Sequence, residues 1–241
     1  MESQTEIEKL KNYADAELKP LTIIIGKNPV ELSLLLRRLW ASAAANDAAY
    51  LPAGRACMVD VNRLKLTKSA ELLLRDLNIE LYATPTALYV KTLSKSFELA
   101  CAPPSIKEVV AAVLALSSGD FRLVFIEEPE AHLHPSAQRL MARAIAEAVN
   151  SGKYVALTTH SDYLISELNN LIALSNAPNV VKKLGYRDVE VLRPEAVAAY
   201  LVKIEDGRAV VERLEVDYTG IPEDEFAKVA EDILRTRNEL Y

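Results

Sequence analysis

Residues 121–136, FRLVFIEEPEAHLHPS, decide the fold of this 241-residue chain. They contain the apolar run Leu123–Ile126, the carboxylates Glu127 and Glu128, and an HLHP turn. An apolar run of this length without polar alternation is typical of a strand that is buried on both faces of a parallel sheet. Pro135 favours the start of a helix directly after the turn.

Two further segments have the same pattern of a buried strand: residues 21–25 (LTIII) and 154–157 (YVAL). Apolar residues at helical spacing across 135–149 predict a helix between the strands 123–126 and 154–157. A strand, helix and strand of this length make a right-handed crossover unit. We therefore predict an α/β fold, a P-loop NTPase-like core with a mostly parallel sheet flanked by helices, as one domain over residues 1–241.

Weaker patterns define the remaining elements. We expect helices at 30–45, 60–78 and 105–116 and from about residue 223, strands at 198–204 and 209–216, and a hairpin within 86–101 outside the main sheet. Ser105 followed by Glu108 predicts a capping box at the start of the helix 105–116. Residues 56–104 are expected to form a smaller inserted lobe.

The composition is that of an ordinary globular protein, with 50% hydrophobic and 26% charged residues. No apolar run reaches the roughly 18 residues that a membrane helix needs, and the polar start does not resemble a secretory signal. Cys57 and Cys101 are too few for a disulfide scaffold, and we expect them as small core residues. The sequence thus predicts a cytoplasmic protein without a membrane partner.

The net charge of -6 disfavours a generally basic nucleic-acid binder. The charge is uneven, because residues 61–95 carry six Lys or Arg against three acids, and residues 214–241 carry eight acids against three bases. We interpret the basic stretch as a solvated face. An acidic partner or a phosphate backbone remains the alternative.

Polar residues follow the strands predicted at 123–126 and 154–157. In open α/β sheets the carboxyl ends of the strands form the ligand-binding edge. We therefore expect Glu127, Glu128 and His160 to converge beside the loop after Ile25. This set suits nucleoside-triphosphate hydrolysis, in which one carboxylate holds Mg²⁺, the second orients water and the histidine senses the γ-phosphate.

These motifs resemble those of ABC-class ATPases of the RecF, SMC and Rad50 type, above all the compact AAA family ATPases related to the OLD proteins. EEPEAHLHP at 127–135 is similar to their Walker B strand and its turn, and THS at 159–161 is similar to their switch strand. YLPAGR at 50–55 and GIPE at 220–223 resemble two other segments of the family.

The resemblance implies ATP and Mg²⁺ as cofactors and a dimer in which two subunits build each nucleotide site. It places Glu127 as the acid on the metal side, Glu128 as the catalytic base and His160 as the switch. The partner is then a second copy, in a homodimer, or an ATPase paralogue, in a heterodimer.

The phosphate loop departs from the motif G-x-x-x-x-G-K-[ST]. In GKNPVELS at 26–33 the first Gly and the final Ser are in register, but Pro29 has no N–H to donate. Glu31 replaces the second Gly and adds a negative charge near the phosphates, which costs roughly 3 kcal/mol for each charge pair at about 5 Å. Leu32 stands where the Lys belongs. The nucleotide-site candidates are Gly26, Lys27, Asn28, Ser33 and Ser105, with Glu127 and Ser33 as Mg²⁺ ligands if nucleotide binds.

The signature motif that grips a partner's γ-phosphate is also altered. The resemblance places Pro104 on its Ser and Ser105 on its Gly, within APPSIK at 102–107. A helix N-terminus and the Ser105 hydroxyl are what is left of this anion site.

Three hypotheses follow. The leading one is a pseudoenzyme with a degenerate Walker A motif, a regulatory or partner-binding subunit with weak or no ATP hydrolysis. The alternative is a working ATPase that uses Lys27 and Ser33 in an altered loop. A third is a metal-dependent nuclease or hydrolase, whose ligands would be Glu127, Glu128, Glu130, His132, His134 and His160.

Overall fold

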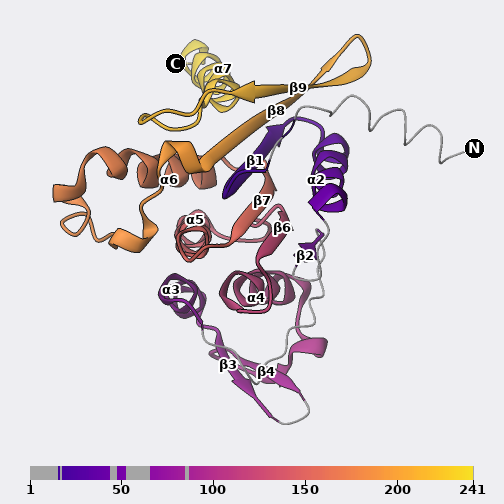
Figure 1. Cartoon of the computed structure of the whole chain (residues 1–241), viewed down its shortest axis with the longest axis vertical. Helices are drawn as coiled ribbons and strands as arrows, with labels where there is room; N and C mark the ends of the chain where they lie inside the picture. Colours follow the sequence, from indigo (N-terminus) through magenta and orange to yellow (C-terminus); the bar gives the residue numbers. More distant parts are fainter. Residues whose placement is uncertain (1–15, 17, 44–47, 53–65, 85–86, 241) are drawn as a thin grey trace, which may run out of the picture.

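A computed structural model describes residues 16, 18–43, 48–52, 66–84 and 87–240 of the chain (Figure 1). The strands are β1 (Leu21–Gly26), β2 (Ala48–Leu51), β3 (Glu80–Ala83), β4 (Leu88–Lys91), β5 (Ser96–Glu98), β6 (Leu123–Glu127), β7 (Tyr154–Thr159), β8 (Val197–Glu205) and β9 (Arg208–Leu214). The helices are α2 (Pro29–Ala43), α3 (Lys68–Asp76), α4 (Pro104–Ser117), α5 (Pro135–Asn150), α6 (Asp162–Ala173) and α7 (Asp224–Glu239). Short 3₁₀ turns lie at Leu99–Cys101, Leu174–Asn176, Pro178–Val180, Asp188–Glu190 and Pro194–Ala196.

The main sheet has the strand order β2-β6-β7-β1-β8-β9. All neighbouring pairs are parallel except β8 and β9, which form an antiparallel hairpin. Helix α5 connects β6 to β7, as the crossover pattern predicted. The prediction of an α/β fold with a mostly parallel sheet flanked by helices is confirmed.

The central strands are buried on both faces, which explains their unbroken apolar runs. In β1, Ile23 and Ile25 belong to the larger core, which also contains buried residues of α3, α4, α5 and α6. Ile24 belongs to a second core on the other face, together with four leucines of α2 and Phe125 of β6. Figure 1 shows α2 on one side of the strands and α5 on the other.

A charged cluster joins α3 to α5 within the larger core. Glu147 of α5 accepts hydrogen bonds from the backbone N–H of Ser69 at 2.7 Å and from Arg187 Nη2 at 2.9 Å. Arg187 also contacts Glu190, whose side chain is fully buried and is held in addition by Arg143. The buried charges are thus paired, as burial requires.

The small antiparallel sheet β3-β4-β5 lies apart from the main sheet, at the opposite end of the molecule from α7 (Figure 1). It contains the hairpin predicted within 86–101 and one additional strand, β3. The helix predicted at 60–78 begins only at Lys68, because the Thr67 side chain caps it, and residues 56–65 and 85–86 of the expected lobe lie outside the described residues. Cys101 is exposed, so its prediction as a core residue was wrong; Cys57 lies outside the described part.

The helix α4 starts differently from the prediction. Its N-cap is Pro103, which makes no side-chain capping bond, and the predicted capping box of Ser105 and Glu108 is therefore wrong. Pro104 can open the helix because the first turn needs no N–H from it. Glu108 is instead buried and lies beside His132, with 3.6 Å between Glu108 Oε2 and His132 Nε2.

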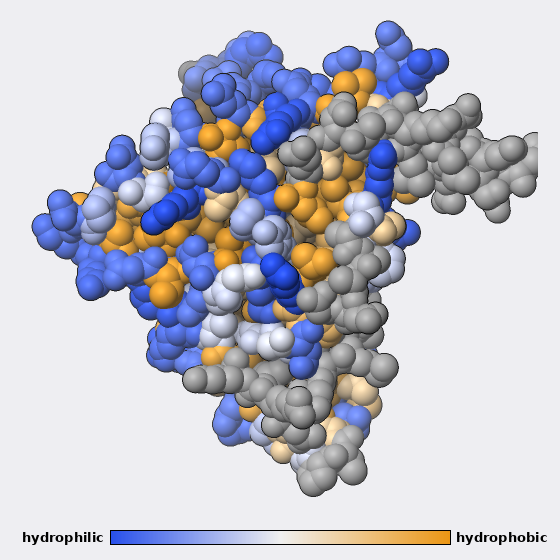
Figure 2. Space-filling view, viewed as in Figure 1, coloured by the Kyte–Doolittle hydropathy of each residue, from blue (hydrophilic) through white to orange (hydrophobic). Residues whose placement is uncertain are grey.

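Within the described segments, none of the helices combines the length and the apolar character needed to cross a membrane. Figure 2 shows apolar residues at the surface mainly at the level of α2 and α6, while the region of α7 is mostly hydrophilic in this view.

Acid should weaken the contact between α3 and α5. Burial raises the pKa of Glu147, but hydrogen bonds from Arg187 and Ser69 outweigh burial and lower its pKa from 4.5 to about 2. The unfolded carboxyl takes up its proton near its ordinary pKa, so this contribution to stability is present above about pH 4.5 and is lost as the pH falls towards 2. We expect chemical denaturation between pH 6 and pH 3 to show a shallower loss of stability in Glu147→Gln.

The matched control is Glu80→Gln, which removes a carboxylate from an exposed pair with Lys91. This variant should keep the wild-type pH dependence, because exposed ion pairs contribute little. Parallel curves for Glu147→Gln and the wild type would contradict the prediction.

Candidate functional site

The carboxyl ends of β1, β6 and β7 meet at one edge of the main sheet, where the sequence placed the site. Gly26 ends β1, Glu127 ends β6 and Thr159 ends β7. The three strands are neighbours in the order β6-β7-β1, so Glu128 and His160 follow adjacent strand ends. The structure therefore brings the predicted phosphate-loop and Walker B segments to a common edge.

The segment expected as a phosphate loop is short, because α2 already begins at Pro29. Asn28 caps this helix: its Oδ1 accepts hydrogen bonds from the N–H of Val30 at 3.0 Å and of Glu31 at 3.4 Å, and its carbonyl accepts one from Leu32 N–H at 3.2 Å. A phosphate at a helix N-terminus needs these amides as donors. Here the chain itself uses them.

Leu32, at the position of the motif's Lys, packs inside the protein. Its side chain is 1% exposed and belongs to the core between α2 and the sheet. A Cβ on Gly26 would lie 2.5 Å from the carbonyl oxygen of Val202 and 3.2 Å from Leu32 Cδ2, so Gly26 is needed for close packing. Ser33, the expected Mg²⁺ ligand, is half-buried in the first turns of α2.

Lys27, the proposed substitute for the missing Lys, points to α7. Its Nζ lies 3.7 Å from Oε2 of Glu225, and the Lys27 side chain is largely exposed. A cavity of about 230 Å³ lies beside this pair, lined also by His160 and Phe226. This volume is below the roughly 300–1,000 Å³ of typical ligand pockets.

Glu127, the predicted acid on the metal side, has a protein cation beside it. The carboxylate is 5% exposed, accepts a hydrogen bond from the Tyr50 hydroxyl, and has its Oε1 3.7 Å from Nε of Arg37. Arg37 in turn donates to the Tyr50 oxygen at 3.2 Å. Burial, together with the Glu127 carboxylate, raises the pKa of the Tyr50 hydroxyl, so this hydroxyl stays a donor. A guanidinium from α2 and a phenol from β2 thus stabilise the charge of Glu127.

The sequence did not reveal this pairing. Arg37 lies in the helix predicted at 30–45 and was not among the predicted site residues. Tyr50 was part of a family-like segment, 50–55, whose last residues lie outside the described part of the chain. No sequence spacing links either side chain to Glu127, because the pairing β2–β6 brings Tyr50 beside β6 only in the folded protein.

Glu128 and His160 face each other as expected. Oε1 of Glu128 is 3.8 Å from Nε2 of His160, and both side chains are partly exposed. Glu128 adopts a φ of 45°, a conformation that is uncommon outside Gly. Its N–H donates to the carbonyl and hydroxyl oxygens of Thr158 at 3.1 and 3.2 Å, which holds this backbone in place. The catalytic roles of the pair stay a prediction.

Glu130 joins the loops after β6 and β7, although it was not predicted as a positioning residue for this edge. Its Oε1 accepts hydrogen bonds from the Thr159 hydroxyl at 2.7 Å and from His160 N–H at 2.8 Å. Burial raises the pKa of this carboxyl above its usual range, while the same hydrogen bonds act against that rise. The Glu-x-Pro-Glu turn therefore positions the backbone of His160.

The histidines of the HLHP turn have structural partners. His132 lies beside the buried Glu108, and Nδ1 of His134 accepts a bond from Ser136 N–H at 3.3 Å as the cap of α5. Across the described residues, no three His, Cys, Asp or Glu side chains are grouped to hold a metal ion. This arrangement gives the metal-dependent nuclease hypothesis no site among them.

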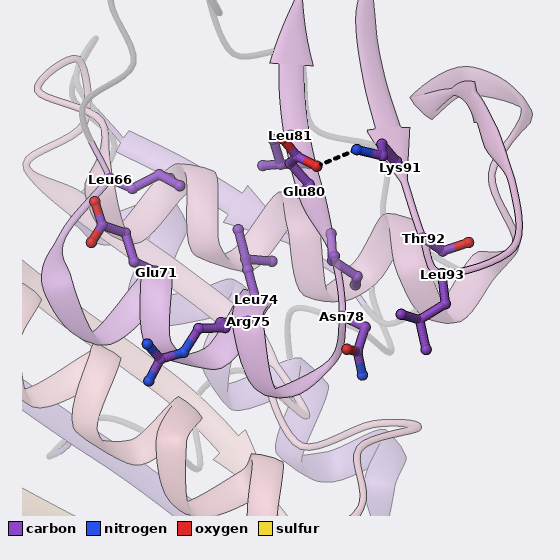
Figure 3. Close-up of a pocket in the computed structure, with 11 residues that line it drawn as sticks. Leu66, Glu71, Leu74, Arg75, Asn78, Glu80, Leu81, Lys91, Thr92 and Leu93 are labelled. Carbon is purple, nitrogen blue, oxygen red and sulfur yellow. Dashed lines mark hydrogen bonds and ion pairs between the residues drawn. The ribbon is translucent and has the colours of Figure 1, made fainter.

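One predicted site residue, Ser105, and one cavity that the sequence did not predict lie outside the contacts described above. Ser105 is exposed in the first turn of α4. A larger cavity, of about 570 Å³, lies between α3 and the hairpin β3–β4 (Figure 3). Its lining includes the apolar side chains of Leu66, Leu74 and Leu81, and Glu80 and Lys91, which also line it, pair with each other at 2.9 Å (Figure 3).

Residues 114–165 match the family model described as AAA ATPase domain. The match runs from the end of α4 through Glu127, Glu128, α5 and His160 into α6, and it contains the stretch 121–136 that decides the fold. It confirms the predicted resemblance to ATPases over this segment. Comparison with curated proteins found no match.

Several solved structures align with this chain at low identity. The SMC head domain from Thermotoga maritima aligns with a TM-score of 0.47 and 10% identity over 83% of this chain and 93% of that chain. A complex containing the archaeal ribosome recycling factor aABCE1 aligns with a TM-score of 0.44 and 12% identity over 81% of this chain and 38% of that chain. The Smc head domain with a coiled coil and joint from Pyrococcus yayanosii aligns with a TM-score of 0.43 and 14% identity over 68% of this chain and 28% of that chain. This chain thus spans far less than two thirds of the length of the last two chains.

Removing the Tyr50 hydroxyl should destabilise the protein. Tyr50→Phe removes a hydrogen bond to the nearly buried carboxylate of Glu127, so we expect the free energy of unfolding to fall by about 1–3 kcal/mol. Urea denaturation at neutral pH measures this change.

Tyr82→Phe is the matched control for this variant. The Tyr82 hydroxyl bonds Ser96 at 2.6 Å on an exposed surface, so its loss should change stability by no more than about 0.5 kcal/mol. Equal effects of the two substitutions would show that the bond between Tyr50 and Glu127 has no special weight.

Proposed function

We propose that this chain is an ATPase-type domain that does not bind Mg·ATP at its own phosphate loop and acts as a regulatory or partner-binding subunit. The capping of α2 by Asn28 is the observation that carries the proposal. A loop that wraps phosphates needs a run of free N–H groups. The N–H groups of Val30, Glu31 and Leu32 have partners within the chain, and Pro29 has no N–H to offer.

The charges at this edge support the same conclusion. Leu32 is buried and neutral, and Lys27 lies beside Glu225 instead of over the loop. Mg²⁺ at Glu127 would have to replace the Tyr50 donor and lie close to the Arg37 guanidinium, which repels a cation. The residues at this edge are therefore a poor fit to Mg·ATP.

Dimerisation with an ATPase paralogue or with a second copy is the partner arrangement that the family resemblance implies. In such a dimer each nucleotide site combines one subunit's phosphate loop with the other's signature. Two copies of this chain would alter both halves of each site. A paralogue with an intact loop would hold ATP in one site, opposite the exposed Ser105 and the N-terminus of α4.

A working ATPase is the second candidate, and one observation favours it. Glu128 and His160 lie 3.8 Å apart, and Glu130 holds the backbone of His160 through a hydrogen bond of 2.8 Å. A carboxylate and an imidazole in this arrangement suit the orientation of water. The same turn also has a folding role, since Glu130 joins the loops after β6 and β7.

Nucleotide binding separates the two candidates. A ligand that binds the native state raises its stability by RT ln(1 + [L]/Kd), about 2.7 kcal/mol at a hundredfold excess over Kd. We expect no change in the melting temperature with millimolar Mg·ATP and no heat of binding in calorimetry. Mg²⁺ alone and ATP with EDTA serve as controls. A rise of several degrees with Mg·ATP only would overturn the proposal.

Phosphate release by the purified chain gives a second test. We expect Glu128→Gln to leave the background rate unchanged, because no bound nucleotide is there to be hydrolysed. Glu205→Gln, at an exposed carboxylate of the β8–β9 hairpin, is the control. A rate that falls at least tenfold in Glu128→Gln but not in Glu205→Gln would support the working ATPase.

A further inference from the structure

Among the described residues, the packing and ion-pair contacts between α7 and the rest of the protein lie near the start of the helix. Phe226 packs against the larger core, and Glu225 lies beside Lys27. From Ala227 to Leu240 every residue is exposed. A single helix of this length is marginally stable in water unless one of its faces is packed. The exposed part of α7 therefore calls for a packing partner, and none of the described residues covers it.

Four apolar residues of α7 follow the heptad spacing of a coiled coil. Phe226, Val229, Ile233 and Leu240 occupy a and d positions, the polar Thr236 occupies the remaining d position, and the apolar Leu234 lies at a b position. Beyond Phe226 this seam faces solvent, with Val229 54%, Ile233 64% and Leu240 75% exposed. A seam at the a and d positions is what a helix presents to another helix, and of the exposed large apolar residues of α7 Leu234 lies outside it.

A hollow runs along this seam. It has a volume of about 350 Å³ and is lined by Val229, Asp232, Ile233 and Thr236. The smaller cavity beside Lys27 and His160 shares Val229 with it. All four residues that line the first hollow belong to α7, so this side of the helix is open surface that a second helix can reach.

We propose that α7 pairs in parallel with α7 of a second copy of this chain. The charges beside the seam select this occupant and this direction. Asp232 is at a g position and Arg237 at the next e position, and in a parallel pair these two positions face each other across the seam. The twofold axis makes this contact twice, as Asp232 with Arg237 of the second copy and the reverse.

An antiparallel pair would place g positions opposite g positions. Those positions are Glu225, Asp232 and Glu239, so like charges would meet along that side. Within its own helix Asp232 contacts Arg235 at 2.9 Å, but both side chains are exposed and such a pair is worth little. Asp232 is therefore available to Arg237 of the second copy.

The pairing deepens the proposed function, because it names a second copy as a partner and α7 as the contact. Its test uses no nucleotide, so failure of the pairing and binding of Mg·ATP are separate outcomes. The seam is only about two heptads long, so the dimer should be weak and should depend on protein concentration.

Sedimentation equilibrium of the purified chain over about a hundredfold range of concentration measures the pairing. We expect a monomer at the low end and a dimer at the high end. Val229→Asp/Ile233→Asp places carboxylates in the seam and should give a monomer throughout. Leu234→Asp is the matched control, because Leu234 is 56% exposed on the same helix but lies off the seam, and it should leave the dimer intact.

Three results would overturn the pairing through α7. They are a wild-type monomer at every concentration, a dimer that survives Val229→Asp/Ile233→Asp, and equal loss of the dimer in Leu234→Asp. Circular dichroism of each variant checks that the chain is folded, so a loss of dimer is read only from folded protein.

A charge exchange tests the parallel direction. Asp232→Arg alone and Arg237→Asp alone each place two like-charge contacts across the seam, and each should weaken the dimer by about 5- to 30-fold. The double variant Asp232→Arg/Arg237→Asp restores opposite charges and should recover the wild-type dimer constant. A tighter dimer in Asp232→Arg alone would overturn the parallel arrangement, because it would mean that acidic g positions face one another.

Discussion

The burial of Leu32 between α2 and the sheet sets the geometry of the whole candidate edge. Leu32 packs with Ile24 of β1 and Phe125 of β6, so the first turn of α2 must lie directly above the strand ends. Lys27 and Asn28 alone then connect β1 to α2. So short a connection leaves the Asn28 side chain as the cap of the helix and leaves no loop to wrap an anion. Gly26 fits here because a side chain would meet the backbone of β8.

The same helix also determines the surroundings of Glu127. A carboxylate at the end of a buried strand needs a cation or hydrogen-bond donors, since desolvated charge is costly. Arg37 lies five residues after Leu32 on α2 and reaches this carboxylate together with Tyr50. Packing through Leu32 and pairing through Arg37 are therefore linked. A change that moved α2 to open the phosphate loop would also remove the guanidinium from Glu127.

On the other side of this edge, hydrogen bonds hold the loops after β6 and β7 together. Glu130 binds the hydroxyl of Thr159 and the backbone of His160, and Glu128 is held in its left-handed conformation by Thr158. These bonds join the loops after β6 and β7, so the acidic turn has a structural role that does not depend on nucleotide hydrolysis. Polar residues that look catalytic in the sequence thus also stabilise the sheet edge.

The sequence by itself determined the buried strands at 21–25, 123–126 and 154–157, because the hydrophobic period is a local property of the chain. It also determined that Glu128 and His160 meet, because both follow the carboxyl ends of parallel strands. It also predicted departures from the phosphate-loop motif at Pro29, Glu31 and Leu32. Only the tertiary structure decided that α2 starts at Pro29 and that Arg37 reaches Glu127. Both depend on how a helix and strands distant in the chain pack together, and no local pattern records the depth at which a helix docks or which side chains its docking brings into contact.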